Sequence, residues 1–152
     1  MPLLFVFVGK TKEGFVREGI DKYAALIGRQ VPLEIREIKG SSATDRKKAV
    51  EDEADSILER VGPSDFFILL DERGKELESV GFAGELGKIF DTGRRIVISA
   101  GGPFGLSGRV KERADLMMSL SRLTFTHEMA RLIMMEQLYR ALTIIKGSTY
   151  HY

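Results

Sequence analysis

The sequence contains no cysteine and no tryptophan, and it has only two histidines, His127 and His151. Without cysteine, a disulfide framework, a thiolate metal site and a cysteine nucleophile are excluded, and we expect a cytoplasmic protein. Two imidazoles do not make a multi-histidine metal site, so we expect no metal. The longest apolar run, Leu3 to Val8, is six residues, too short for a membrane span. It also lacks the basic start of a signal peptide.

An excess of one charge is absent as well. The 23 lysines and arginines balance 22 acidic residues and leave a net charge of +1, so the whole chain gives no nucleic-acid signal. Residues 109–152 hold seven basic and four acidic groups; this local excess indicates either a surface that faces a polyanion or ordinary solvated charge. With 152 residues, 43% of them hydrophobic, we expect one domain over residues 1–152.

Strand and helix patterns alternate along the chain. Apolar runs predict strands at 3–8, 31–38, 66–70, 95–100 and 116–120. Amphipathic stretches predict helices at 13–28, 45–61, 79–91, 108–114 and 126–146. This alternation is typical of an α/β fold with a mostly parallel sheet covered by helices on both faces. Ligands bind such sheets at the carboxyl ends of the strands, so a polar turn at 71–75, Gly101 and Ser121 should meet at one edge.

The predicted first and last helices differ in their apolar character. The first places Phe15 on or near its apolar face, as an ordinary surface helix does. The last is apolar almost all round, apart from one narrow stripe that contains Arg140. A second apolar face indicates either a homodimer, with residues such as Met134 and Ile145 at the interface, or a helix held in a central groove of one chain.

Several segments outside these elements carry chemically useful residues. Glycines in Gly101–Ser107 allow close approach of the backbone to a ligand, although the loop matches neither a P-loop nor a dinucleotide fingerprint. The acids and bases of Leu69–Lys75 suit either ribose hydroxyls or local ion pairs. Backbone groups of Ser119–Thr126 are available to a planar ligand. Tyr150 and His151 suit stacking on an unstacked base.

In order along the chain, these segments resemble a known family. The resemblance rests on four segments: Leu-Asp-Glu-Arg-Gly-Lys75, Gly-Gly-Pro-Phe-Gly-Leu-Ser107, Ser-Leu-Ser-Arg-Leu-Thr-Phe-Thr-His-Glu-Met-Ala-Arg131 and the tail through Tyr150-His151. The set is similar to the small bacterial ribosomal RNA large-subunit methyltransferases of the SPOUT superfamily, over essentially the whole chain. The resemblance implies a C-terminal trefoil knot, a homodimer, and methylation of N3 of pseudouridine 1915 in helix 69 of 23S rRNA, on the assembled 70S ribosome.

The resemblance also implies a cofactor and its contacts. S-adenosylmethionine would be held by eight residues: Leu70, Gly101, Leu120, Ser121, Arg122, Leu123, Thr124 and Phe125. We expect Arg140 to stabilise the anion that develops on N3, His151 to handle the proton and Tyr150 to stack on the base. Two alternatives stay open: a non-catalytic dimeric factor that associates with the ribosome, and a SPOUT methyltransferase that acts on tRNA.

Overall fold

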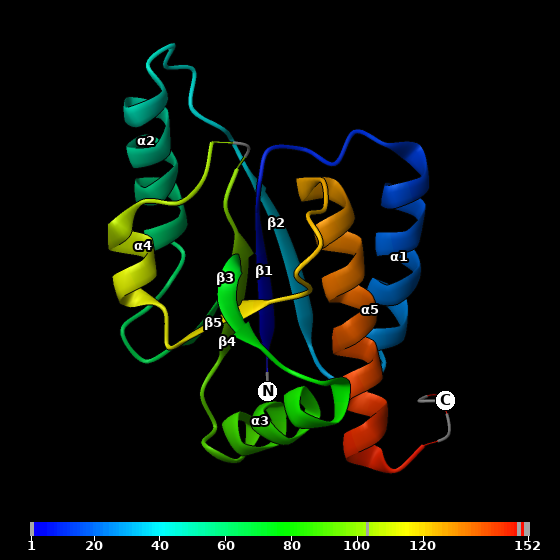
Figure 1. Cartoon of the computed structure of the whole chain (residues 1–152). Helices are drawn as coiled ribbons and strands as arrows, with labels where there is room; N and C mark the ends of the chain where they lie inside the picture. Colours follow the sequence, from blue (N-terminus) through cyan, green and yellow to red (C-terminus); the bar gives the residue numbers. More distant parts are fainter. Residues whose placement is uncertain (1, 103, 149, 151–152) are drawn as a thin grey trace.

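A five-stranded sheet forms the centre of the computed structural model, which describes residues 2–102, 104–148 and 150 (Figure 1). The strands are β1 (Leu3–Val8), β2 (Leu33–Ile38), β3 (Phe66–Glu76), β4 (Ile96–Ala100) and β5 (Leu116–Ser119). They lie in the order β2-β1-β4-β3-β5, and every neighbouring pair is parallel. The helices are α1 (Gly14–Gly28), α2 (Arg46–Leu58), α3 (Ser79–Asp91), α4 (Gly108–Arg113) and α5 (His127–Lys146). The predicted α/β class is confirmed.

Helices cover both faces of the sheet (Figure 1). Successive side chains of β1 point to opposite faces: Phe5 packs in a core with α1, α3 and α5, while Val6 packs in a second core with α2 and α4. All six residues of β1 are buried. The continuous apolar run at the start of the sequence is therefore a central strand buried on both sides.

Helix α5 lies in a central groove of the chain, which was one of the two explanations for its second apolar face. It packs between α1 and α3, so packing within one chain buries most of its apolar residues. Met134 is completely buried, and its expected place at a dimer interface is wrong. Ile145 keeps 43% of its surface exposed. Within the described ranges, no helix combines the length and the apolar character that crossing a membrane requires.

The local end signals of α5 are confirmed. The Thr126 hydroxyl accepts a hydrogen bond from the Met129 N–H at 3.2 Å, as an N-cap does. Gly147 ends the helix with a φ of 74°, a left-handed conformation that glycine adopts without strain. In α1, by contrast, the placement of Phe15 on the buried face is wrong: Phe15 is 62% exposed and Val16 is buried in its stead.

The polar segment after residue 70 departs from the predicted turn. The chain continues as β3 to Glu76, and Leu70 and Lys75 both align with Met118 of β5. The residues between them bulge out of the register. At Gly74 the two backbones approach so closely that an added methyl group would lie 2.7 Å from the backbone nitrogen of Met118. Pairing with the distant β5 therefore overrides the local polarity of this segment.

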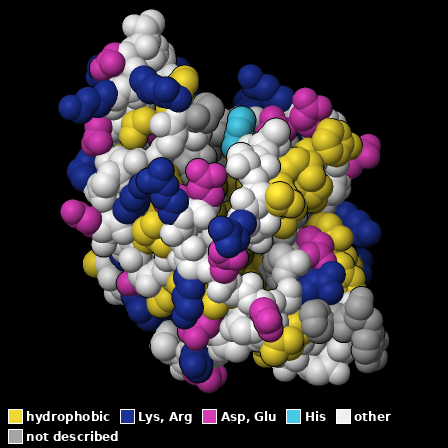
Figure 2. All heavy atoms as spheres, viewed as in Figure 1, with side chains coloured by type: hydrophobic (Ala, Val, Ile, Leu, Met, Phe, Trp, Pro, Cys, Tyr) yellow, Lys and Arg dark blue, Asp and Glu magenta, His cyan; other side chains and the backbone are white. Residues whose placement is uncertain are grey.

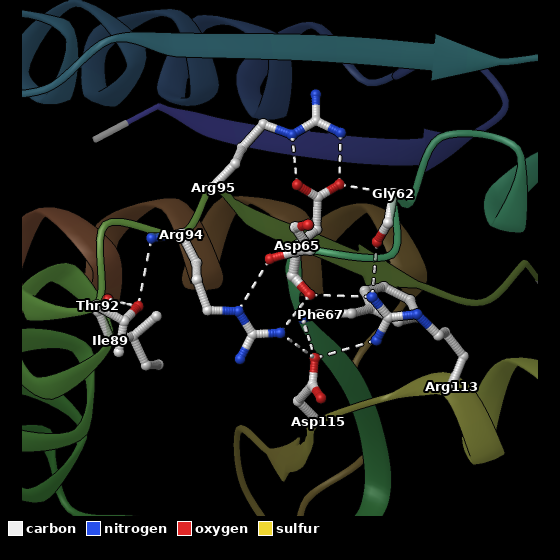
Figure 3. A network of polar contacts seen from close by, with 10 residues as sticks. Gly62, Asp65, Phe67, Ile89, Thr92, Arg94, Arg95, Arg113 and Asp115 are labelled. Atoms are coloured by element: carbon white, nitrogen blue, oxygen red, sulfur yellow. Dashed lines mark hydrogen bonds and ion pairs between the residues drawn. The ribbon is translucent and has the colours of Figure 1, made fainter.

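A polar network closes the opposite edge of the sheet, where β3 and β4 begin (Figure 3). The Asp65 carboxylate accepts hydrogen bonds from Arg95 at 2.6 and 3.0 Å and from the Gly62 N–H at 2.6 Å. Asp115 accepts one from the Phe67 N–H at 2.8 Å. The hydrogen bonds from Arg95 are the main reason that the pKa of Asp65 lies below its ordinary value, against a smaller opposing effect of burial.

We expect this network to make stability depend on pH in the acidic range. A carboxylate with a depressed pKa stabilises the folded state above its unfolded pKa of about 4, and that contribution disappears as the pH falls through the folded pKa. Urea unfolding of the wild type at several pH values below about 5 should therefore show a falling free energy of unfolding. Asp65→Asn should be less stable near neutral pH and should show a shallower fall. Parallel curves for the two proteins would contradict this role of Asp65.

Candidate active site

A cavity of about 560 Å³ opens at the edge where β3, β4 and β5 approach their carboxyl ends. Its walls come from three segments far apart in the sequence: the β3 bulge, the glycine-rich loop after β4, and the loop between β5 and α5. They contribute, among others, Leu70, Asp71, Gly101, Leu106, Leu120, Ser121, Leu123, Thr124, Phe125 and His127. The prediction that three strand-end segments meet at one edge is confirmed.

The loop between β5 and α5 is shaped by its own hydroxyl groups. The Ser119 hydroxyl donates to the Ser121 carbonyl oxygen at 2.8 Å, and the Ser121 hydroxyl accepts from the Leu123 N–H at 3.0 Å. The turn that these two hydrogen bonds fix leaves the Leu123 side chain 71% exposed at the wall of the cavity. The loop thus combines apolar side chains with backbone polar groups, which suits a ligand with an apolar or aromatic ring and a polar edge.

The glycine-rich loop reaches the cavity through positions where a side chain would not fit. A methyl group on Gly101 would lie 2.6 Å from Cδ2 of Leu106, a side chain that lines the cavity. Gly105 has a φ of 96°, and its N–H donates to the Gly102 carbonyl oxygen at 3.3 Å. The loop therefore folds tightly enough that its backbone forms part of the cavity wall.

Charged groups at the rim are partly paired. Lys111 Nζ lies 3.7 Å from Oδ2 of Asp71, and Asp71 also accepts a hydrogen bond from the Arg73 N–H at 3.2 Å. Among the described residues there is no group of three or more histidine, cysteine or acidic side chains that could hold a metal ion. His127, the first residue of α5, lines the cavity at the helix N-terminus.

The start of α5 is fixed by two buried charged residues that the sequence patterns did not single out. Glu128 accepts hydrogen bonds from the N–H groups of Lys12 at 3.1 Å and Glu13 at 2.9 Å. Arg131 donates to the Val8 carbonyl oxygen at 2.6 Å and also bonds to Thr11. A charged residue among the many apolar residues of this helix, next to the cavity loop, is the signal that could have found them.

These contacts balance the cost of burying two charges. Burial raises the pKa of Glu128, but the Glu13 and Lys12 N–H groups and the charge of Arg131 outweigh it, so the net shift is downward. Burial lowers the pKa of Arg131, and Glu128 opposes that effect. Because the ordinary pKa of an arginine is so high, Arg131 stays protonated. The pair thus joins α5, and the cavity loop before it, to the end of β1.

Seven of the eight residues predicted to contact a cofactor line this cavity. The exception is Arg122, whose side chain is exposed and does not line the wall. Leu70 comes from β3, Gly101 follows β4, and the other five belong to the loop before α5. Three separate stretches of sequence are therefore brought to one cavity.

Arg140 and Tyr150 lie together, but away from the cavity. Arg140 donates to Oε1 of Glu136 at 2.6 Å, and its guanidinium carbon lies 5.0 Å from the centre of the Tyr150 ring. The Tyr150 hydroxyl donates to the same Glu136 oxygen at 3.2 Å. Burial raises the pKa of Tyr150, and hydrogen bonding with Tyr23 and the charge of Glu136 raise it further.

The helix itself separates this cluster from the cavity. Ala130 lines the cavity near the start of α5, and ten residues further along the axis the rise to Arg140 is about 15 Å. His151, predicted to handle the proton, lies outside the described residues. Within one chain, the cavity therefore lies at the start of α5, whereas Arg140 and Tyr150 lie toward its other end.

Comparison with a solved structure gives the class of fold. The whole chain matches a probable methylase family protein from Haemophilus influenzae with a TM-score of 0.56 and 12% sequence identity, covering 99% of this chain and 70% of that one. At this identity the likeness shows a shared fold. A family model described as "Predicted SPOUT methyltransferase" matches residues 1–151, so fold and sequence both point to the SPOUT methyltransferases.

Curated relatives give the particular family. A protein from Geobacter metallireducens named "Ribosomal RNA large subunit methyltransferase H" is 43% identical, covering 100% of this chain and 99% of that protein. Proteins of the same name from Geobacter sulfurreducens and Trichlorobacter lovleyi are 40% and 37% identical, each over the full length of both chains. The chain belongs to the ribosomal RNA large subunit methyltransferase H family of SPOUT methyltransferases.

Proposed function

We propose that this chain transfers a methyl group from S-adenosylmethionine to N3 of pseudouridine 1915 in helix 69 of 23S rRNA, with the assembled 70S ribosome as substrate. The observation that carries the proposal is the cavity lined by seven of the eight predicted cofactor residues. Full-length similarity to relatives named for methylation of large-subunit rRNA supports the acceptor. The chain acts as a single unit over residues 1–152 in this proposal.

The cavity suits S-adenosylmethionine in size and in wall chemistry. Its volume of about 560 Å³ lies within the ordinary range for a cofactor or drug-sized ligand. The walls combine apolar side chains such as Leu70 and Phe125 with polar side chains and loop backbone, which fits an adenine ring that hydrogen-bonds through its edge. Any side chain at residue 101 would clash with Leu106, which lines the cavity.

The bound cofactor supplies an activated methyl group on a sulfonium, so the task of the protein is to position donor and acceptor. The loops at Gly101 and Leu120–Phe125 would hold the donor and exclude water. N3 of the base must lose a proton before it attacks. Arg140, as a cation, would stabilise the negative charge that develops there. His151 would accept the proton, and Tyr150 would stack on the base.

The separation of the cavity from Arg140 favours a homodimer in which each site uses both chains. A symmetric pair of chains could bring the Arg140 end of one α5 to the cavity of the other. Apolar side chains remain exposed for such an interface: Phe15, Leu123 and Ile145 are between 43% and 71% exposed. Figure 2 shows apolar side chains gathered over α1 and α5, as a partner chain would require.

A methylation assay tests the proposal and its alternatives together. Radiolabelled S-adenosylmethionine is supplied with 70S ribosomes, 50S subunits, naked rRNA or tRNA, and the modified nucleotide is located in the product. We expect label on N3 of the pseudouridine in helix 69, with 70S ribosomes as the best substrate. Label on tRNA would favour the tRNA enzyme. A chain that binds ribosomes but neither binds the donor nor transfers a methyl group would be a non-catalytic factor.

Gly101→Val should abolish binding of S-adenosylmethionine. The added side chain would meet Leu106 and the Gly105 carbonyl oxygen, both within 3.0 Å of the first added carbon, and would push Leu106 into the cavity. Calorimetry should show no heat of binding, while the unfolding midpoint stays near that of the wild type because the loop lies at the surface. A Gly101→Val chain with normal affinity would remove Gly101 from the site.

A further inference from the structure

Glu53 on α2 is a buried acid that the proposed reaction does not use. Only 6% of its surface is exposed, although glutamate is rarely buried unless it is paired. One carboxylate oxygen, Oε2, is buried and has no hydrogen-bond partner. Burial raises the pKa of Glu53, and a hydrogen bond from the Ser41 backbone only partly offsets that effect. No ion pair between Glu53 and a described basic residue offsets the cost.

The unpartnered oxygen faces the glycine-rich loop. A methyl group built on Gly102 would lie 2.6 Å from Oε2 of Glu53, so the carboxyl group fills the space that a side chain at residue 102 would take. Gly102 itself lines the cavity. The carboxyl group therefore touches the outer side of a turn whose inner side is the cavity wall.

A buried polar atom without a partner costs stability, and such atoms persist in native proteins chiefly where function uses them. A leucine or methionine would fill the same space at no such cost. The loop beside Glu53 lines the cavity with the glycines Gly101, Gly102 and Gly105, and the donors that a glycine offers are its backbone N–H groups. A change in the conformation of this loop could therefore supply the hydrogen bond that Oε2 of Glu53 lacks.

We propose that Glu53 is a positioning residue for the glycine-rich loop: when the methyl donor occupies the cavity, Oε2 accepts a hydrogen bond from the loop backbone and holds the loop against the donor. Without the donor the oxygen has no partner, and the energetic cost is borne by the free protein. Binding of the donor then supplies the missing contact. This inference rests on the proposed use of S-adenosylmethionine.

Glu53→Gln tests the proposal, because it keeps the size of the side chain but replaces one acceptor oxygen with a donor. Asp55→Asn is the matched control: it lies on the same helix, its side chain is 62% exposed, and it does not line the cavity. We expect Glu53→Gln to keep or raise the unfolding midpoint of the free protein. Its Kd for S-adenosylmethionine should rise about tenfold or more, as loss of a hydrogen bond to a charged acceptor does. The control should stay within twofold of the wild type.

Amide hydrogen exchange supplies a readout that a merely structural role would not change. Donor binding should slow exchange at the amides of residues 101–102 and 104–107 in the wild type and in Asp55→Asn, and much less in Glu53→Gln. A Kd within twofold of the wild type would overturn the proposal, and so would a raised Kd with unchanged loop protection. If the wild type itself binds no S-adenosylmethionine, the proposed function fails first. These two failures are therefore distinguishable.

Discussion

Two inactive chains should restore methyl transfer when they are combined in one dimer. Gly101→Val is expected to abolish donor binding, and Arg140→Ala removes the cation that we place at the acceptor, a change expected to lower the rate about 10²-fold. Because the cavity and Arg140 lie about 15 Å apart along α5, an intact site needs the cavity of one chain and Arg140 of the other. A dimer with one chain of each kind then contains one intact site.

The test is coexpression of the two variants with different tags and purification through both tags. The mixed dimer should methylate ribosomes at about half of the wild-type rate, since one of its two symmetric sites is whole. Each variant alone serves as a control and should methylate ribosomes at least about 10²-fold more slowly than the wild type. If each site used residues of a single chain, neither chain of the mixed dimer could act, and an inactive mixed dimer would refute the shared site.

Among glycine-to-alanine changes, we expect Gly74→Ala to destabilise the fold the most. The added methyl group would lie 2.7 Å from the Met118 backbone nitrogen, and backbone cannot move aside as a side chain can. The pairing of Lys75 with Met118 and of Glu76 with Ser119 would be lost or shifted. We expect a loss of roughly 3 kcal/mol of unfolding free energy, at the upper end for overpacking.

Gly84→Ala is the matched control for this change. Gly84 lies within α3 and has nothing within 4 Å of an added methyl group, so alanine should stabilise the helix by about 0.5–1 kcal/mol. Thermal unfolding of the two variants should therefore move in opposite directions, with a drop of about 10 °C for Gly74→Ala. A Gly74→Ala protein as stable as the wild type would show that the β3 bulge tolerates a side chain.

Local signals in the sequence predicted most of the elements. Thr126 and Gly147 mark the ends of α5 because a cap and a left-handed stop depend on a few neighbouring residues. The buried run Leu3–Val8 indicated a central strand because its composition has no polar side. The fold class followed from the alternation of such elements, whereas the strand order did not, since it depends on contacts between distant segments.

The failures share a non-local cause. Residues 71–75 are polar and contain a glycine, so their local chemistry is that of a turn, but pairing with β5 keeps them in β3. Phe15 and Val16 are adjacent apolar residues at the start of α1, and only the packing of the neighbouring helices decides which one is buried. Likewise, α5 has more than one apolar face because α1 and α3 flank it within the same chain.

For the site, the sequence indicated where loops meet but not how they are supported. The family resemblance named cofactor residues, and seven of these eight share one cavity, while Arg122 is exposed and does not line it. Glu128, Arg131 and Glu53 carry charge into buried places, and from sequence alone a charged residue in a helix is first assigned to the surface. Glu128 and Arg131 bond to groups at the end of β1 and in the segment before α1, more than a hundred residues away in the sequence, which no spacing rule indicates.

The position of α5 between α1 and α3 also affects how the protein is made. During synthesis the chain emerges from its N-terminus, so β1 to β4 leave the ribosome before β5 and α5 exist. Until α5 packs against it, the core that α1 and α3 form on one face of the sheet, around residues such as Phe5, is incomplete. The cavity has no wall from residues 119–127 until then. A chain without α5 therefore has an incomplete apolar core and an incomplete binding site, so folding and competence to bind a ligand are reached together once α5 has been made.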